Sequence, residues 1–229
     1  MPTPKKVLLL KRWLNILVRK QALELEEKEE TSRSDQSPNV IPELNEISQI
    51  LDGQLYLSGC RAATADRLAS LGVTAVVRAL TEAEERAMME STKGGISLPD
   101  HIDTLHVRLL DLETSDIQSH FDHVSRFIDS HLRSGHKVLV HCGAGISRSS
   151  TLIIAYLITY QHLTLRAAYA MLKNKRKIVR PNNGFFRQLI EHERDAREDG
   201  RCSVRMIITN NGTPMPDIVY ENAIMAKLR

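Results

Sequence analysis

Residues 137–160 read KVLVHCGAGISRSSTLIIAYLITY, and this stretch decides the fold. The run 137–141 is short, apolar and β-branched, which is typical of a buried strand. Residues 150–160 form an apolar run that is too long for one strand and indicates a buried helix. Gly143 and Gly145 lie in the loop between the two. A strand that passes through such a loop into a helix favours a layered α/β protein.

The loop between Cys142 and Arg148 has the features of an anion-binding site. Because it opens a helix, it directs successive backbone N–H groups and the positive end of the helix dipole toward one place. Glycines permit positive φ angles and close backbone approach. Arg148 adds a planar fork that can bind two phosphate oxygens. The predicted phosphate-binding residues are Gly143, Ala144, Gly145, Ile146, Ser147 and Arg148.

Cys142 lies in the same electrostatic field. Helix N-termini and neighbouring cations favour the thiolate form of cysteine, so we expect Cys142 to act as a nucleophile. The hydroxyl of Ser149 can donate a hydrogen bond to the sulfur and help it leave in a second reaction step. We expect His141 to orient the loop through backbone contacts rather than to act as a base.

Cleavage of a phosphate ester by such a thiolate requires a proton for the departing oxygen. Asp111 is the predicted donor, because it follows the expected strand 104–110 and stands at the start of a polar loop, 31 residues before Cys142. The same carboxyl group would then act as a base on the attacking water. Asp116 and Glu113 are rivals in the same loop.

Three segments together resemble the dual-specificity protein phosphatases. They are the His-Cys-x-Ala-Gly-x-Ser-Arg-Ser motif at 141–149, the Asp111 loop with Phe121-Asp122 and Phe127-Ile128-Asp129, and Arg180-Pro181-Asn182-x-Gly184-Phe185-x-x-Gln188-Leu189. The likeness runs from about Ile47 to Glu193 and is strongest to the small atypical members, which lack a rhodanese-like kinase-binding domain. Some of these members also carry a C-terminal extension similar to residues 203–220.

The resemblance implies a cysteine-dependent enzyme that uses no metal or other cofactor. Its shallow pocket would accept phosphotyrosine and phosphoserine or phosphothreonine in phosphoprotein substrates. Asn182 would support the pocket wall. Ala144 and Ile146 are uncharged, whereas relatives that act on inositol phospholipids tend to have lysines at these positions, so a lipid substrate is disfavoured.

Length and composition predict one catalytic domain with tails. The chain has 229 residues, 42% of them hydrophobic, which suffices for one core. We expect a leader and linker at 1–40, the catalytic domain at 41–199 and an extension at 200–229. The domain should be α/β, with a mixed sheet of about five strands and helices on both faces. The expected strands are 46–51, 54–58, 73–80, 104–110 and 137–141, and the expected helices are 64–71, 82–91, 117–133, 148–161, 165–174 and 183–197.

Charge and cysteine content exclude several classes of protein. The net charge of +3 is too small to indicate a nucleic-acid partner, and no nucleic-acid-binding motif is present. The three cysteines have no metal-binding spacing and no disulfide framework, and a thiolate enzyme needs a reducing compartment. A redox role for Cys60 or Cys202 is left open. We expect a cytoplasmic or nuclear location.

The basic leader offers several alternatives. Residues 1–23 contain no acidic residue, and their spacing of apolar residues would give a helix one apolar face. The segment 5–20 could contact an anionic membrane surface, or the leader could direct the chain to mitochondria. Lys11-Arg12-x-Leu14-x-Ile16 also fits a basic and hydrophobic docking peptide for MAP kinases. A solvated leader without such a role is the simplest interpretation.

Two functions from different classes fit the whole chain. The first is an enzyme that hydrolyses phosphoprotein esters through a cysteinyl-phosphate intermediate. The second is a phospho-dependent binding or scaffold protein with weak turnover. The presence of Asp111 favours the enzyme, because a binding protein has no need of an acid.

Overall fold

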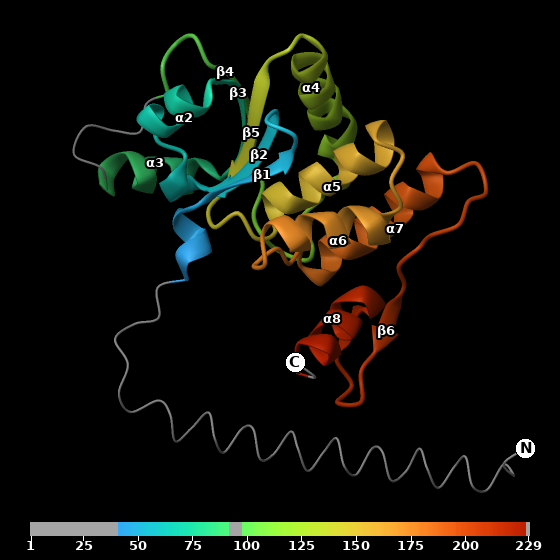
Figure 1. Cartoon of the computed structure of the whole chain (residues 1–229). Helices are drawn as coiled ribbons and strands as arrows, with labels where there is room; N and C mark the ends of the chain where they lie inside the picture. The colour runs from blue at the N-terminus through green and yellow to red at the C-terminus, as the bar shows by residue number, and fades with distance from the viewer. Residues whose placement is uncertain (1–40, 92–97, 228–229) are drawn as a thin grey trace, which may run out of the picture. The chain divides into compact units, whose positions relative to one another are not determined.

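The computed structural model describes residues 41–91 and 98–227, without the side chains of residues 89–91 and 227. Its centre is a five-stranded sheet in the order β1-β2-β5-β3-β4 (Figure 1). The strands are β1 (Ile47–Leu51), β2 (Leu55–Gly59), β3 (Val73–Ala79), β4 (Asp103–Val107) and β5 (Lys137–Cys142). β1 is antiparallel to β2, and the other pairs are parallel. The expected mixed sheet of five strands is confirmed.

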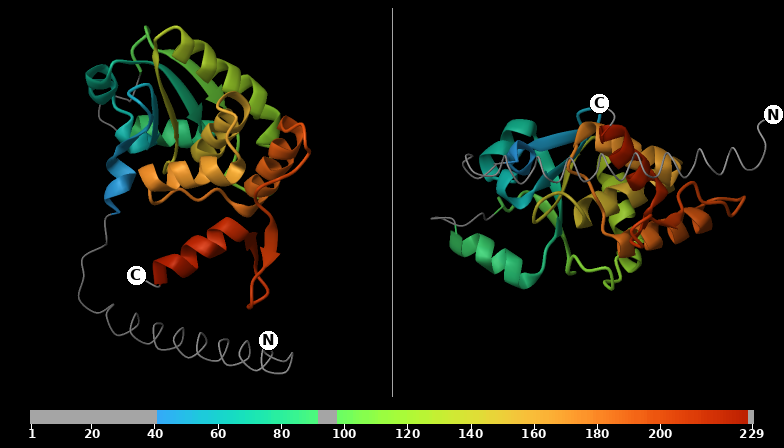
Figure 2. Two further views of the ribbon diagram at one scale, coloured as in Figure 1. Left: turned by 45° about the vertical axis from the view of Figure 1, so that its right-hand side comes forward. Right: turned by 90° about the horizontal axis from the view of Figure 1, so that it is seen from below.

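Helices cover both faces of the sheet, as expected. They are α2 (Ala65–Leu71), α3 (Glu82–Ser91), α4 (Phe121–Arg133), α5 (Arg148–Tyr160), α6 (Leu165–Lys175) and α7 (Asn183–Ala196). α2 and α3 lie on one side, and α4 to α7 lie on the other (Figure 1). The view from below in Figure 2 shows α3 and the α5–α7 layer on opposite sides of the strands.

The central strand β5 divides the core into two layers. Successive side chains of a strand point to opposite faces, so Val138 and Val140 pack with the α4–α7 layer while Leu139 packs with Leu68 of α2. All of these side chains are fully buried. α5 packs against three helices and the sheet, which explains why its sequence is apolar on nearly every side.

Two expected boundaries were wrong. The strand expected at 104–110 ends at Val107, because β4 pairs only with β3 and the last pair in that ladder joins Ala79 to Val107. Asp111 therefore lies in a loop rather than at a strand end. The helix expected from 117 begins as a short 3-10 turn, η3 (Gln118–His120), and becomes α-helical at Phe121. The side chain of Gln188 binds the backbone N–H groups of Ile117 and Gln118 at this start.

The chain after α7 packs against the same core. It forms β6 (Met206–Ile208), β7 (Pro214–Pro216) and α8 (Asp217–Lys227), and both Val204 and Ile218 are buried in the main cluster. The fully buried Glu193 binds the N–H groups of Leu165 and Ser203 at 2.9 and 2.7 Å. This carboxylate therefore joins α7 to both α6 and the C-terminal segment.

The basic leader lies outside the described residues, and so do its proposed membrane, mitochondrial and docking roles. Over residues 41–91 and 98–227, no helix combines the length and apolarity needed to cross a bilayer.

Candidate active site

Cys142 ends β5, and the loop after it leads into α5 at Arg148. The Cys142 side chain is 1% exposed, and its Sγ accepts two hydrogen bonds. One comes from the backbone N–H of Gly145 at 3.2 Å and the other from the hydroxyl of Ser149 at 3.1 Å. Two donors that converge on one sulfur stabilise negative charge there. The loop therefore places two hydrogen-bond donors on the Cys142 sulfur.

The shape of the loop depends on close packing and on one buried cation. Gly145 has φ +71°, and a Cβ there would lie 2.5 Å from the backbone carbon of Ser58 at the end of β2. The Arg176 guanidinium, 1% exposed, donates to the carbonyls of Ala144 and Gly145 at 2.9 Å each. The Ala144 carbonyl and the Gly145 N–H belong to one peptide group and point in opposite directions. By holding that carbonyl, Arg176 directs the N–H toward the sulfur.

Arg148, at the first turn of α5, is held by an ion pair from the other side of the site. Its Nη1 and Nη2 donate to Oε2 and Oε1 of Glu84 in α3, both at 2.6 Å. Burial lowers the pKa of the Arg148 guanidinium, but its hydrogen bonds to Glu84 and the nearby Cys142 and Asp111 outweigh this effect, so that the pKa lies above its ordinary value. The bond from Arg148 lowers the pKa of Glu84 to about 2. Both groups are therefore charged near neutral pH.

Asp111 lies against the start of α5. Its Oδ1 accepts hydrogen bonds from the Ser147 hydroxyl at 2.7 Å and from Nδ2 of Asn182 at 2.9 Å. Its Oδ2 lies 3.8 Å from Nε of Arg148. The structure thus brings Asp111, Ser147 and Arg148 together, although Asp111 is 31 residues before Cys142 in the sequence.

The two rival carboxylates are engaged elsewhere. Asp116 accepts from the backbone N–H of Ser119 at 3.1 Å, at the start of the 3-10 turn. Glu113 pairs with Arg187 of α7 at 3.1 Å. Within the part of the chain that the structure describes, neither carboxylate bonds to the loop that holds Cys142, so the geometry favours Asp111.

Helix α7 holds the loop that carries Asp111. Gln188 accepts from the N–H groups of Ile117 and Gln118 at 2.9 and 2.8 Å and donates to the Ser115 carbonyl at 2.9 Å. A Cβ on Gly184 would lie 1.9 Å from the carbonyl oxygen of Glu113, so the backbones of α7 and the loop are in direct contact. This contact explains the glycine at the start of α7.

The two residues expected to support the site, Asn182 and His141, lie at the start of α7 and beneath the loop. Asn182 caps α7 by accepting from the N–H of Phe185 at 2.9 Å, while its Nδ2 holds Asp111. His141 is fully buried beneath the loop, and burial lowers its pKa to about 4. A neutral, buried ring of this kind is not a base that reaches substrate.

Sequence reasoning missed Glu84 and Arg176. Glu84 lies in a charge-rich segment that is typical of a solvated helix, and only the Thr81-x-x-Glu84 spacing of a capping box singles it out. Arg176 lies in the run KNKRK at 173–177, where its neighbours Lys175 and Lys177 are exposed. No local signal distinguishes the one buried cation in that run.

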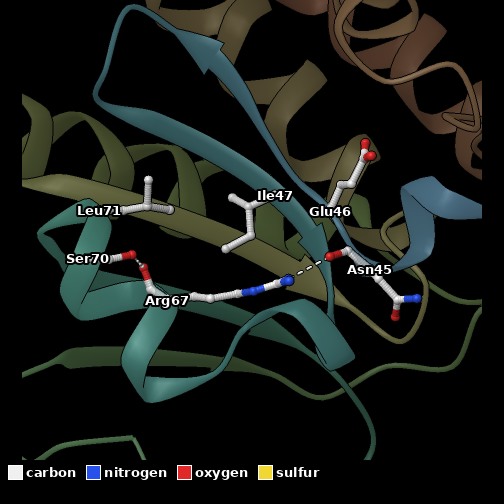
Figure 3. A pocket seen from close by; sticks show the side chains of 6 residues that line it. All are labelled: Asn45, Glu46, Ile47, Arg67, Ser70 and Leu71. Carbon is white, nitrogen blue, oxygen red and sulfur yellow. Dashed lines mark hydrogen bonds between the residues drawn. The ribbon is translucent and has the colours of Figure 1, made fainter.

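Two open pockets flank the described fold. One, of about 270 Å³, adjoins the loop and is lined by Cys60, Arg61, Leu80, Glu84, Ala87, Met88 and Gly143. The other, of about 360 Å³, lies between β1 and α2. Figure 3 shows Arg67 crossing this second pocket to bond the carbonyl of Asn45. Because no residue of the Cys142 loop lines the second pocket, it is separate from the candidate active site.

Comparisons with known proteins match this chain to one family. The family model "Dual specificity phosphatase, catalytic domain" matches residues 55–195. "Dual specificity protein phosphatase 14" of Bos taurus is 36% identical over 187 residues, which cover 81% of this chain and 87% of the relative.

Solved structures give the same result. Human DUSP28 has a TM-score of 0.57 and 28% identity, covering 70% of this chain and 98% of that one. The human "tyrosine phosphatase-like serine/threonine/tyrosine-interacting protein" has a TM-score of 0.57 and 30% identity, covering 65% of this chain and 96% of that one. The extent of the family match and the shared fold lead to one conclusion: this chain belongs to the dual specificity phosphatase family.

Proposed function

We propose that this phosphatase hydrolyses phosphotyrosine and phosphoserine or phosphothreonine esters with Cys142 as its nucleophile. The observation that carries the proposal is the pair of hydrogen bonds on Sγ, from Gly145 and Ser149, opposite a carboxylate held at the loop by Ser147. The backbone N–H groups of residues 143–147 and the Arg148 guanidinium would bind the phosphoryl oxygens.

In the first step, the Cys142 thiolate attacks phosphorus and an S–P bond forms. The P–O bond to the leaving group breaks, its electron pair goes to the oxygen, and Asp111 supplies a proton to that oxygen. Because Oδ1 of Asp111 already accepts from Ser147 and Asn182, the proton would be carried on Oδ2. These two bonds orient the carboxyl group without occupying the oxygen that reacts.

In the second step, water attacks the cysteinyl-phosphate. Asp111 takes a proton from the water, the new P–O bond forms, and the S–P bond breaks with its electrons returning to sulfur. The Ser149 hydroxyl, 3.1 Å from Sγ, stabilises the departing thiolate. Inorganic phosphate is released, and the enzyme returns to its starting state.

The remaining features of the enzyme are also proposals. We place the catalytic domain at 41–199, with a leader at 1–40 and an extension at 200–229. The substrates would be phosphoproteins, with MAP kinases as candidate partners through Lys11, Arg12 and the apolar residues after them. A cytoplasmic or nuclear location would suit a reactive thiolate.

A hydrolysis assay with the full chain tests the enzyme against the scaffold alternative. The wild-type protein should release phosphate from a small aryl phosphate, and Cys142→Ser should abolish release while it still binds tungstate, since serine is not ionised near neutral pH. Cys202→Ser is the matched control and should keep its rate. A wild-type protein that binds tungstate without turnover would support the scaffold alternative instead.

A further inference from the structure

The Arg148 guanidinium has two edges, and only one of them is used in the described structure. A guanidinium carries five N–H groups in one plane. Nη1 donates to Oε2 of Glu84 at 2.6 Å and to the carbonyl of Leu109 at 3.3 Å, and Nη2 donates one hydrogen to Oε1 of Glu84 at 2.6 Å. The remaining hydrogens, on Nε and Nη2, lie together on the other edge.

This second edge is buried and has no acceptor. Nε of Arg148 is a buried atom with no hydrogen-bond partner among the described residues. The carboxylate of Asp111 comes no closer to it than 3.8 Å. A buried donor without an acceptor costs free energy and calls for an explanation in a native structure. A phosphoryl group bound in the loop would supply the missing acceptors, because two parallel N–H groups match two of its oxygens.

Glu84 is itself fixed, so it can fix Arg148. Its Oε2 accepts from the backbone N–H of Thr81 at 2.8 Å, and its own N–H donates to the Thr81 hydroxyl at 3.2 Å. This reciprocal arrangement is a capping box, which sets the start of α3 and the direction of the Glu84 side chain together. Gly143 lies against the pair, since a Cβ there would be 3.4 Å from Nη2 and 3.6 Å from Oε1.

We propose that Glu84 is a positioning residue for phosphoryl transfer: it holds one edge of Arg148 so that the Nε edge faces the phosphoryl oxygens bound by the loop. This inference rests on the proposed function and adds to it a residue that does not touch substrate. The opposite role, a carboxylate that blocks the cation until phosphate displaces it, would place Glu84 on the Nε edge. Glu84 instead occupies the edge away from Asp111.

The experiment compares Glu84→Gln with Glu82→Gln in the full chain. Glutamine is compatible with a capping box, so Glu84→Gln should keep the helix start while it removes the charged partner of Arg148. Glu82 is an exposed residue of the same helical turn, so its variant removes the same charge without touching Arg148. The measured quantities are kcat and KM for an aryl phosphate, the inhibition constant of tungstate, and the melting temperature.

We expect kcat/KM of Glu84→Gln to fall by about tenfold to hundredfold, mainly in kcat, because a small displacement of a catalytic group can cost that much. The tungstate inhibition constant should rise by about fivefold or more, since the oriented fork is lost. Glu82→Gln should match the wild type in each measurement. Thr81→Ala, which removes the hydroxyl but keeps the carboxylate, should lose less activity than Glu84→Gln.

Three results would overturn the proposal. Tighter tungstate binding and a lower KM in Glu84→Gln would identify a blocking carboxylate. Equal kinetics in Glu84→Gln and Glu82→Gln would show that Arg148 needs no partner. A loss in Thr81→Ala that equals the loss in Glu84→Gln, with both melting temperatures lowered alike, would assign the effect to the helix cap. Failure of the proposed function is distinct, because the wild-type chain itself would then lack turnover.

Discussion

The loop that carries the proposed nucleophile, Cys142, and the loop that carries the proposed acid, Asp111, are held in different ways. Residues 143–147 are packed against the backbone of β2 and are braced from beneath by the buried guanidinium of Arg176. The acid loop is held from one side by polar contacts to α7, chiefly those of Gln188. It also exposes Leu110 and Leu112, which flank Asp111 and are 55% and 51% exposed.

This difference indicates that the two loops have different roles in the proposed reaction. The proposed nucleophile requires hydrogen-bond donors that are in position before substrate binds, because donors at fixed positions stabilise its negative charge. The acid has to meet leaving groups of different sizes, from an aryl oxygen to an alkyl oxygen. We therefore expect damage to the Cys142 loop to reduce turnover of every substrate, and damage to the acid loop to depend on the leaving group.

Among variants that keep Cys142, the largest effect common to both classes of substrate is expected from Gly145→Ala. The added Cβ would lie 2.5 Å from the Ser58 backbone, so the loop must shift and its N–H would leave the sulfur. We expect kcat/KM to fall by at least about 100-fold on aryl and alkyl phosphates alike, since misplacement of about 1 Å is enough for such a loss. Steady-state kinetics on both substrates measures this.

Gly135→Ala is the matched control for that variant. Gly135 also has a positive φ, +78°, but nothing lies within 4 Å of its added Cβ. It should share the backbone cost of about 1–2 kcal/mol in stability and keep its activity. If Gly145→Ala lowered kcat/KM for only one class of substrate, the Cys142 loop would not serve aryl and alkyl phosphates alike.

Much of the fold could be predicted because its signals are local. The apolar run at 137–141 and the longer one at 150–160 became β5 and α5 with boundaries shifted by one or two residues. The residues between them are contiguous, so the composition of the Cys142 loop was also visible. The end of β4 was not, because it depends on where the neighbouring strand β3 stops pairing.

The two residues that the sequence analysis missed, Glu84 and Arg176, make contacts with partners that are distant in the sequence. Glu84 reaches Arg148 across 64 positions, and Arg176 reaches Gly145 across 31. Both lie in charged runs, and exposed charge is the ordinary expectation for such runs. Only the tertiary arrangement turns these particular side chains inward.

A more selective effect is expected from Asp111→Asn. An aryl oxygen leaves without much help, whereas an alkyl oxygen such as that of phosphoserine needs a proton, and general acids typically contribute about 10²–10⁴-fold. The loss on phosphoserine peptides should therefore exceed the loss on an aryl phosphate by about tenfold or more. Asp116→Asn and Glu113→Gln should keep both rates, and a larger loss in either would move the acid role to that residue.

The smallest effect is expected from Gln188→Ala, which tests whether α7 positions the acid loop. The variant removes the two bonds accepted from Ile117 and Gln118 and the one donated to Ser115, while Asp111 keeps its bonds to Ser147 and Asn182. We expect stability to fall by about 1–3 kcal/mol, the usual cost of leaving partly buried groups unpaired. Turnover of phosphoserine peptides should fall only about two- to fivefold, since the carboxyl group keeps its own contacts, and the aryl phosphate rate should change less. Arg187→Ala removes another tie between α7 and this loop, the half-exposed pair with Glu113, and such pairs contribute only about 0–1 kcal/mol. That control should therefore match the wild type in thermal melts and in both assays. A loss in Gln188→Ala that was equal on both substrates would mean that Gln188 also supports the Cys142 loop, through more than the bond that joins Ser147 to Asp111.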